Sequence, residues 1–238
     1  MEIRDIRAVL FDMDGTLVDS DAAVERAWTV WAGEYGVPVA DVLAIAHGSP
    51  AESTVDRMRP DLSAEERAAA AARQLELQYD DLSDVVATPG AHEVLSVLEA
   101  LGLPWAVVTS ADNRLAKVRL AAAGIEPPVL VTVEDISRGK PDPEGYLHAA
   151  NLLAVPPTDC LVVEDAAVGI AAGHAAGALT AALKGLPADI HLTNLHHLAN
   201  LLTPAQLAST DQSAARTGSA DLTTARTEDA GSSDLTAG

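Results

Sequence analysis

Cysteine, aromatic residues and basic residues are all scarce in this chain of 238 residues. Its one cysteine, Cys160, cannot form a disulfide within the chain, so the sequence does not point to an oxidising compartment. No apolar run approaches the ~20 residues that a membrane-spanning helix needs. The first twelve residues lack the apolar core and the cleavage site of a signal peptide. We therefore expect a soluble, cytoplasmic protein that does not bind membranes.

Basic residues are outnumbered by acidic ones, 15 against 35, which gives a formal net charge of −20. Such a chain lacks the basic surface that binds nucleic acids. A small phosphorylated metabolite would need a local metal ion or lysine to offset this negative field. Hydrophobic residues make up 48% of the chain and aromatic residues 3%, so we expect a sizeable core of Ala, Val and Leu.

From residue 91 onward, apolar strands alternate with helical segments that end at glycine. This alternation is typical of a parallel, doubly wound sheet, so we predict an α/β fold with a Rossmann-like core. The ligand site of such a fold lies beyond the carboxyl ends of its strands. The expected strands are residues 7–12, 105–109, 129–133, 160–163 and 178–183.

Residues 21–86 carry helical patterns and no strand signal, although one helix usually joins two parallel strands. We therefore predict an inserted helical domain here, with the α/β core formed by residues 1–20 and 87–208. Residues 209–238 carry only two large apolar side chains, too few to offset the entropy of ordering, so we expect a disordered tail. An acidic tail could bind a protein partner, but nothing else in the sequence supports one.

The stretch from residue 8 to residue 20, AVLFDMDGTLVDS, has two acids at the end of a buried strand. Residues i and i+2 of a strand point to the same side, so Asp12 and Asp14 can share one site. Adjacent carboxylates repel unless a cation or a proton lies between them, which favours a hard metal ion such as Mg²⁺. The pair also suits chemistry in which one carboxylate attacks and the other moves a proton. Taken alone, an acidic turn would explain the stretch equally well.

Further polar groups follow later strands. Thr109 and Ser110 offer a hydroxyl and turn N–H groups for phosphate oxygens, or else cap the next helix. Lys140 lies between a glycine and a proline, where its ammonium is either aimed at a charged group or, as for most lysines in turns, simply solvated. Glu164 and Asp165 close another strand, where they either cap a helix or complete an oxygen cage for Mg²⁺. Together, these groups predict one site at the strand ends.

The motifs resemble those of the haloacid dehalogenase superfamily, in its phosphatase and phosphomutase branches, over residues 6–183. The resemblance rests on DMDGT after the first strand, TS after WAVV, the string GKPDP, and the ED pair after CLVV. It implies a helical cap domain and makes Asp12 the nucleophile that becomes an aspartyl phosphate. It makes Asp14 the general acid and base. Thr109 would then bind phosphate, and Lys140 would offset its charge.

The metal ion expected for this site is Mg²⁺. Asp12 and Asp165 would bind it directly, Asp14 through its backbone carbonyl, and Glu164 through water. Two further candidates for substrate contact are weaker. The first, His47, rests on a His-Gly pair that is common in the resembling sugar and polyol phosphatases. The second, Arg114, could equally lie on an exposed helix.

These features predict a Mg²⁺-dependent phosphatase that acts on a sugar or polyol phosphate. The main alternative is a phosphomutase related to β-phosphoglucomutase, whose cap carries an Arg after the hinge glycine and a His in the first cap helix. Ala51 and Val24 stand at those positions, unless a shifted gap brings Arg57 or Arg59 into the pocket. A haloacid dehalogenase proper needs no metal and would leave the paired acids unexplained. A binding protein without enzymatic activity would leave all of the predicted catalytic residues at the strand ends unexplained.

Overall fold

The computed structural model describes residues 3–46, 49–80 and 82–203. His47 and the expected tail at residues 209–238 lie outside the described residues. Within the described ranges, no helix is both long and apolar enough to cross a membrane. The described chain up to Leu202 forms one compact unit.

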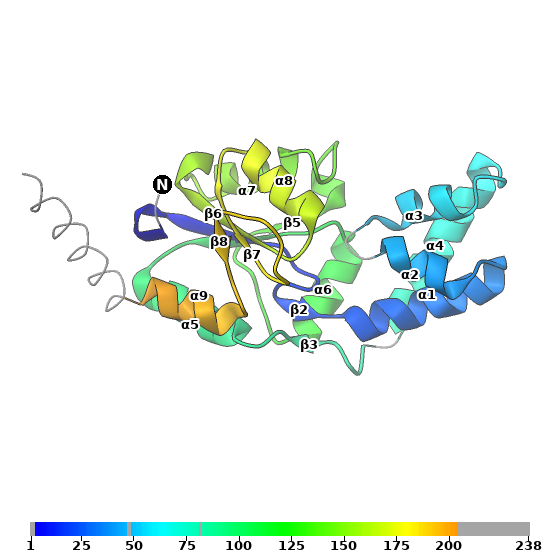
Figure 1. The fold of residues 1–238 in the computed structure, drawn as a ribbon, viewed down its shortest axis with the longest axis horizontal. Coiled ribbons are helices and arrows are strands. Elements are labelled where there is room, and N and C mark those ends of the chain that lie inside the picture. The colour runs from blue at the N-terminus through cyan, green and yellow to red at the C-terminus, as the bar shows by residue number, and fades with distance from the viewer. Residues whose placement is uncertain (1–2, 47–48, 81, 204–238) are drawn as a thin grey trace, which may run out of the picture. The chain divides into compact units, whose positions relative to one another are not determined.

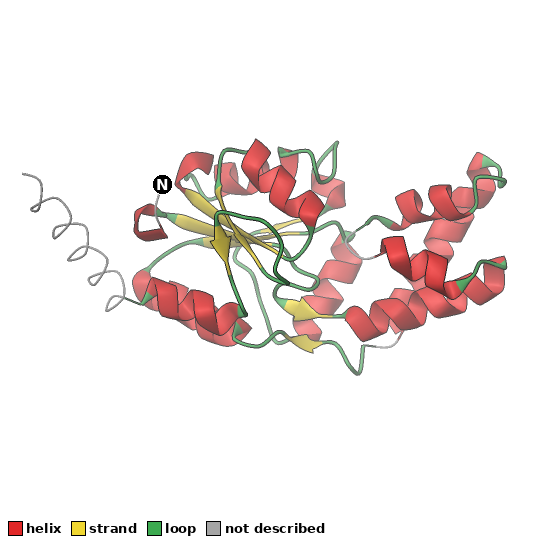
Figure 2. Ribbon diagram, viewed as in Figure 1, coloured by secondary structure: helices red, strands yellow, loops and turns green. Residues whose placement is uncertain are grey.

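A six-stranded sheet in which every pair of neighbours is parallel lies at the centre of the fold (Figure 1, Figure 2). In spatial order, its strands are β5 (Leu130–Val131), β4 (Trp105–Val108), β1 (Ala8–Phe11), β6 (Cys160–Glu164), β7 (Leu179–Ala182) and β8 (Ile190–His191). Phe11 is in register with Val107 of β4 and with Val163 of β6. The residues that follow these three strands therefore meet at one edge. The predicted α/β fold with a parallel sheet is confirmed.

Helices cover both faces of the sheet because side chains alternate along each strand. Ala8 and Leu10 point to one face, where α7 (Glu144–Leu152) and α8 (Ala167–Ala175) pack. Val9 and Phe11 point to the other face. The helices on that second face are α5 (Ala91–Leu101), α6 (Asn113–Ala122) and α9 (Leu195–Leu202). Full burial of Leu10 or Phe11 contributes roughly 1.5–3 kcal/mol of stability each.

The insert between the first two strands of the sheet has a hydrophobic core of its own. Its helices are α1 (Asp21–Tyr35), α2 (Val39–Ala46), α3 (Ala51–Met58) and α4 (Ala64–Asp80). Trp31 is fully buried, stacks on Tyr35 and donates a hydrogen bond to the Ala70 carbonyl at 2.9 Å. Ser63 and Glu66 begin α4 with the reciprocal hydrogen bonds of a capping box.

Two short strands join the insert to the rest of the chain, β2 (Val18–Asp19) and β3 (Val86–Ala87), which pair antiparallel. No strand is expected from the sequence between residues 12 and 105, so that expectation was wrong at both β2 and β3. A strand of two residues is too short to produce an alternating pattern, and it forms because the chain leaves the insert beside the segment that enters it. Short 3-10 helices lie in connecting segments, at Ile3–Asp5, Val133–Asp135 and Pro157–Asp159.

Candidate active site

Asp12 directly follows β1 and is buried at the edge where the strand ends meet. The turn after it contains Gly15, whose φ of 82° is a conformation that glycine adopts without strain. A Cβ atom at Gly15 would overlap the Asp165 carboxylate, so only glycine allows the end of β1 to lie this close to the end of β6. The Asp-x-Asp-Gly turn thus brings two acidic segments into contact.

Lys140 lies at the centre of the polar cluster. Its Nζ atom is 2.5 Å from Asp12 Oδ1, 2.7 Å from Glu164 Oε1 and 3.0 Å from the Val108 carbonyl oxygen. Burial alone would lower the pKa of Lys140, but the carboxylates of Asp12 and Glu164 raise that pKa above its usual value. Lys140 therefore remains charged at neutral pH, with its ammonium aimed at two acids.

Glu164 uses both carboxylate oxygens within the protein. Oε1 accepts from Lys140 and, at 2.6 Å, from the Tyr146 hydroxyl. Oε2 accepts from the backbone N–H groups of Asp165 and Ala166, at 3.2 and 3.3 Å. The residue is only 1% exposed. Glu164 is therefore a buried anchor for Lys140, and its partner Tyr146 was missed because nothing in the sequence distinguishes it from an ordinary core residue.

Three acids form a cluster in which carboxylate oxygens of Asp12, Glu164 and Asp165 all lie within 4.8 Å of one another. Burial raises the pKa of Asp12 well above its usual value; Lys140 opposes this shift, and Glu164 and Asp165 add to it. A divalent cation would relieve the repulsion, and carboxylate oxygens are the ligands that Mg²⁺ and Ca²⁺ prefer. The residues present therefore fit a hard metal ion.

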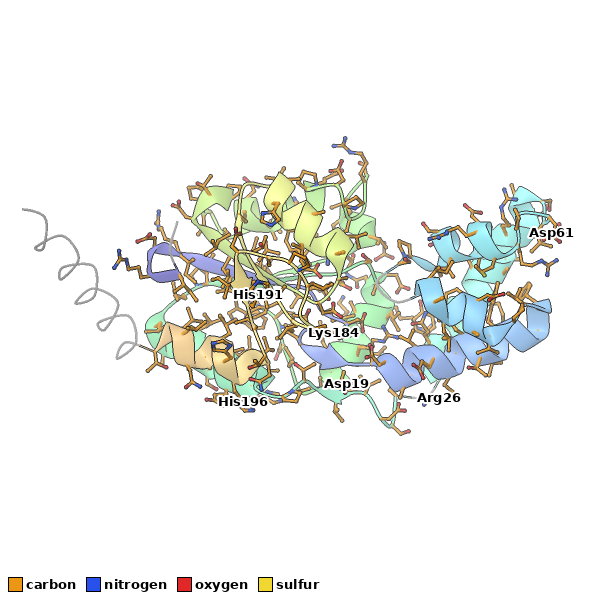
Figure 3. All side chains as sticks on the ribbon, in the orientation of Figure 1. Asp19, Arg26, Asp61, Lys184, His191 and His196 are labelled. Atoms are coloured by element: carbon orange, nitrogen blue, oxygen red, sulfur yellow. The ribbon has the colours of Figure 1, made fainter. Side chains whose placement is uncertain are left out.

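Lys184 approaches the same acids from the loop after β7. Its Nζ atom lies 2.9 Å from Asp165 Oδ2 and 3.6 Å from Asp21 Oδ2. Figure 3 shows Lys184 at the end of the sheet that faces α1. Burial would lower the pKa of Lys184, but its pairing with Asp165 raises that pKa overall. The site therefore contains a second lysine that was not among the predicted site residues.

Asp14 lies outside the carboxylate cluster and contacts α6 instead. Its Oδ1 atom accepts from Arg119 Nη1 at 2.8 Å and from Ser20 Oγ at 2.6 Å. Arg119 is 2% exposed, and its Nη2 donates to Gln78 Oε1 of α4 at 2.6 Å. Sequence reasoning missed Arg119, although it follows Leu115 by four residues on the buried face of a helix, where a charged residue needs a partner.

Three predicted substrate contacts, Lys140 among them, reach the cavity and one does not. Thr109 and Ser110 line it, and Thr109 Oγ1 also accepts from the Ala111 N–H at 3.1 Å. Arg114 is exposed, and its guanidinium lies 4.0 Å from the centre of the Tyr79 ring, so the structure does not bring Arg114 into the cavity. His47, the other candidate, lies outside the described residues.

The polar groups border one cavity of about 100 Å³ between the sheet edge and the insert. From the sheet side, Asp12, Asp14 and Lys140 line it. The insert contributes both polar and apolar walls, and these include Val24, Trp28, Ala51, Gln74, Leu75 and Gln78. A ligand in this cavity would contact acids and a lysine at one end and helices of the insert at the other.

The parallel sheet, with a carboxylate-lysine cluster at its carboxyl edge, places the chain among α/β enzymes. Residues 6–177 match the family described as haloacid dehalogenase-like hydrolase. The chain therefore belongs to the haloacid dehalogenase-like hydrolases.

Relatives of established name are similar over most of their length. The chain is 42% identical to hexitol phosphatase A of Escherichia coli, covering 77% of this chain and 85% of that protein. It is 36% identical to 2-deoxyglucose-6-phosphate phosphatase 1 of Saccharomyces cerevisiae, covering 72% of this chain and 77% of that protein. Among solved structures, β-phosphoglucomutase from Clostridium difficile matches with a TM-score of 0.75 and 20% identity, covering 89% of this chain and 99% of that one. At that identity, the likeness establishes the fold alone.

Proposed function

We propose that this protein is a Mg²⁺-dependent phosphatase that hydrolyses a small sugar or polyol phosphate through an aspartyl-phosphate intermediate. The observation that carries the proposal is the buried contact between Asp12 and Lys140, in a cavity that Asp14 also lines. The names of the two relatives, a hexitol phosphatase and a sugar-phosphate phosphatase, support the substrate class. A dehalogenase that works without metal would leave the second acid of the first motif, Asp14, and the clustering of Asp165 with Asp12 and Glu164 unexplained.

Asp12 attacks first in this mechanism. One of its carboxylate oxygens forms a bond to phosphorus as the bond from phosphorus to the ester oxygen breaks. Lys140 and the hydroxyl and N–H groups of Thr109 and Ser110 offset the charge on the transferring phosphoryl group. The products of this step are an aspartyl phosphate on Asp12 and the alcohol of the substrate.

Asp14 moves the protons. Its Oδ1 atom accepts from Arg119 and Ser20, so we assign the transferred proton to Oδ2. Protonated Asp14 gives this proton to the departing alkoxide. In the second step, the Asp14 carboxylate takes a proton from water, whose oxygen attacks phosphorus and breaks the bond to Asp12. Inorganic phosphate leaves, and both aspartates return to their starting forms.

The carboxylates of Asp12 and Asp165 and the backbone carbonyl of Asp14 would hold Mg²⁺, with Glu164 acting through water. The cluster of carboxylate oxygens supports this assignment, because its three acids face only two lysines, Lys140 and Lys184. When bound, Mg²⁺ supplies further positive charge to offset the phosphoryl oxygens.

The insert would act as a cap that selects the substrate. We propose that residues 21–86 form this cap and that residues 1–20 and 87–208 form the catalytic core. The separate hydrophobic core of the insert and its share of the cavity wall support this division.

A phosphate-release screen with Mg²⁺ tests the proposal. The panel contains sugar, polyol and nucleotide monophosphates, and free phosphate is measured for the wild-type protein. We expect release from at least one sugar or polyol phosphate and little from nucleotides. Absence of release from every ester would contradict the phosphatase assignment, and a preference for nucleotides would contradict the substrate class.

A further inference from the structure

A hydrogen-bonded chain of side chains links the site to the insert. Arg119 donates to Asp14 from Nη1 and to Gln78 Oε1 from Nη2. Gln78 Nε2 in turn donates to Gln74 Oε1 at 2.6 Å. Arg119 belongs to α6 and the two glutamines to α4, which packs against α6. All four residues line the cavity.

The direction of this chain of hydrogen bonds is fixed by Arg119. A guanidinium has donors and no acceptor, so the Gln78 atom that faces it must be the carbonyl oxygen. The Gln78 amide nitrogen then faces Gln74 and can only donate, so the Gln74 atom that receives it must also be an oxygen. The amide nitrogen of Gln74 is therefore the free end of the chain, and neither amide can be flipped without losing a hydrogen bond.

This free end has no partner within the described residues. Gln74 is fully buried, yet its Nε2 atom lacks any hydrogen-bond partner, and so does Arg119 Nε. A buried donor without an acceptor costs free energy, and a ligand that supplies an acceptor recovers it. Both residues lie in the wall of the cavity, so a ligand that enters it and displaces the atoms now covering these two nitrogens can supply the missing acceptors.

The charge balance identifies the acceptor. Gln74 is a neutral amide, and Arg119 already donates to Asp14 and Gln78 from its two terminal nitrogens, so this part of the wall presents no free cationic group to a second phosphate. A hydroxyl oxygen accepts a hydrogen bond without adding charge. Resting on the proposed function, we propose that Gln74 Nε2, with Arg119 Nε beside it, binds hydroxyl oxygens on the carbon chain of the substrate. Gln74 is then a residue that selects hydroxylated phosphate esters.

Glucitol 6-phosphate and hexyl phosphate test this assignment because they have the same carbon-chain length and differ in their hydroxyl groups. The variants are Gln74→Met, which removes both polar atoms, and Gln74→Glu, which keeps an acceptor for Gln78 but removes the donor. The measured quantity is the ratio of kcat/KM for glucitol 6-phosphate to kcat/KM for hexyl phosphate. We expect this ratio to fall at least about tenfold in both variants. The control Glu76→Gln, at an exposed position on the same helix, should leave the ratio unchanged.

Binding to inactive protein separates this inference from the proposed function. In an Asp12→Asn background, calorimetry should show that Gln74→Met weakens the binding of glucitol 6-phosphate much more than the binding of hexyl phosphate. That result would support the assignment even if the wild-type protein released no phosphate. Equal weakening of both ligands, or an unchanged kcat/KM ratio in folded variants that still release phosphate, would overturn the role of Gln74 and leave the phosphatase proposal standing.

Discussion

Gly169 lies so close to Glu164 that a Cβ atom on Gly169 would overlap both oxygens of the Glu164 carboxylate. Gly169 is in the first turn of α8, and Glu164 is the last residue of β6. The missing side chain therefore leaves the space in which Glu164 holds Lys140.

We predict that Gly169→Ala displaces Glu164 and, with it, Lys140. Misplacing a catalytic group by about 1 Å can reduce turnover on the order of 100-fold, and overpacking typically costs about 1–3 kcal/mol of stability. Phosphate release and urea unfolding measure the two effects. The control is Gly33→Ala, because no atom would lie within 4 Å of the added Cβ there. If Gly169→Ala had wild-type turnover, the contact between Glu164 and Lys140 would not be needed for activity.

Replacing the proposed nucleophile should abolish turnover without unfolding the protein. Asp12→Asn keeps the size of the side chain, and Lys140 retains Glu164 as its partner. We expect phosphate release to fall at least about 1,000-fold, while the circular dichroism spectrum stays unchanged. Asp19→Asn, at an exposed acid shortly after the same strand, is the control and should keep its activity. Substantial activity in Asp12→Asn would exclude Asp12 as the attacking group.

The polar residues at the carboxyl edge of the sheet could be predicted from local sequence alone. The helix residues that form hydrogen bonds at this site could not. Asp12 and Thr109 each follow an apolar strand and Glu164 ends one, and parallel strands necessarily bring such positions together. By contrast, Arg119 meets a residue 105 positions away, and Gln78 a residue 41 positions away. The Gln78 pair depends on how α4 packs on α6, and the Asp14 pair on where α6 lies beside the turn after β1; helical periodicity specifies neither. Periodicity could mark Arg119 as buried, but it could not name Asp14 as its partner.

Removing divalent metal should stop the reaction. The three clustered carboxylates of Asp12, Glu164 and Asp165 face two lysines, Lys140 and Lys184, so one negative charge is left for a metal ion to offset. We therefore expect activity to be lost in EDTA and restored by Mg²⁺. Mg²⁺ should also raise the melting temperature, because it binds only the folded site. In Asp165→Asn, the Mg²⁺ concentration that restores half of the activity and the Mg²⁺ concentration that gives half of the rise in melting temperature should both increase. Full activity after complete metal removal would instead favour the dehalogenase alternative.

The ion pair between α1 and α4 should make the stability of the insert depend on pH. Arg73 donates to both carboxylate oxygens of Glu34, at 2.9 and 3.0 Å, and these hydrogen bonds lower the pKa of Glu34 below 4.5, with burial opposing. A lowered folded-state pKa means that the stabilisation is present above about pH 4.5 and is lost as the pH falls through the folded-state value.

Urea unfolding of Glu34→Gln, near pH 7 and near pH 3, tests this dependence. Both side chains of the pair are 38% exposed, so solvent screens them, and we expect a loss below about 1 kcal/mol near pH 7 that disappears near pH 3. Glu25→Gln, at an exposed position on the same helix, should show no such change. A loss of equal size at both pH values would mean that Glu34 acts through packing instead of charge.

The cavity lacks the groups that a phosphomutase of this family would need. Ala51 and Val24 line it, at the positions where the resembling mutases carry an Arg and a His. Neither replacement can hold a distal phosphate or gate the acid-base residue through a hydrogen bond. Arg59 does not compensate, because it donates to Asp61 and to the Tyr35 carbonyl, and Figure 3 shows Asp61 at the far end of the insert. Arg57 is exposed and is not among the residues that line the cavity.

We therefore predict hydrolysis instead of transfer within one sugar. The test supplies β-glucose 1-phosphate together with catalytic glucose 1,6-bisphosphate and Mg²⁺, and it follows glucose 6-phosphate and free phosphate separately. A mutase must keep water from the aspartyl phosphate while the bisphosphate turns round. Besides Lys140, the cavity wall contains the cationic side chain of Arg119, but Arg119 already donates to Asp14 and Gln78, so it is not free to hold the distal phosphate of that intermediate. We expect any turnover to release free phosphate. Ala51→Arg would add the missing cation and should shift part of the product towards glucose 6-phosphate. Efficient formation of glucose 6-phosphate by the wild-type protein, with little free phosphate, would contradict the phosphatase assignment.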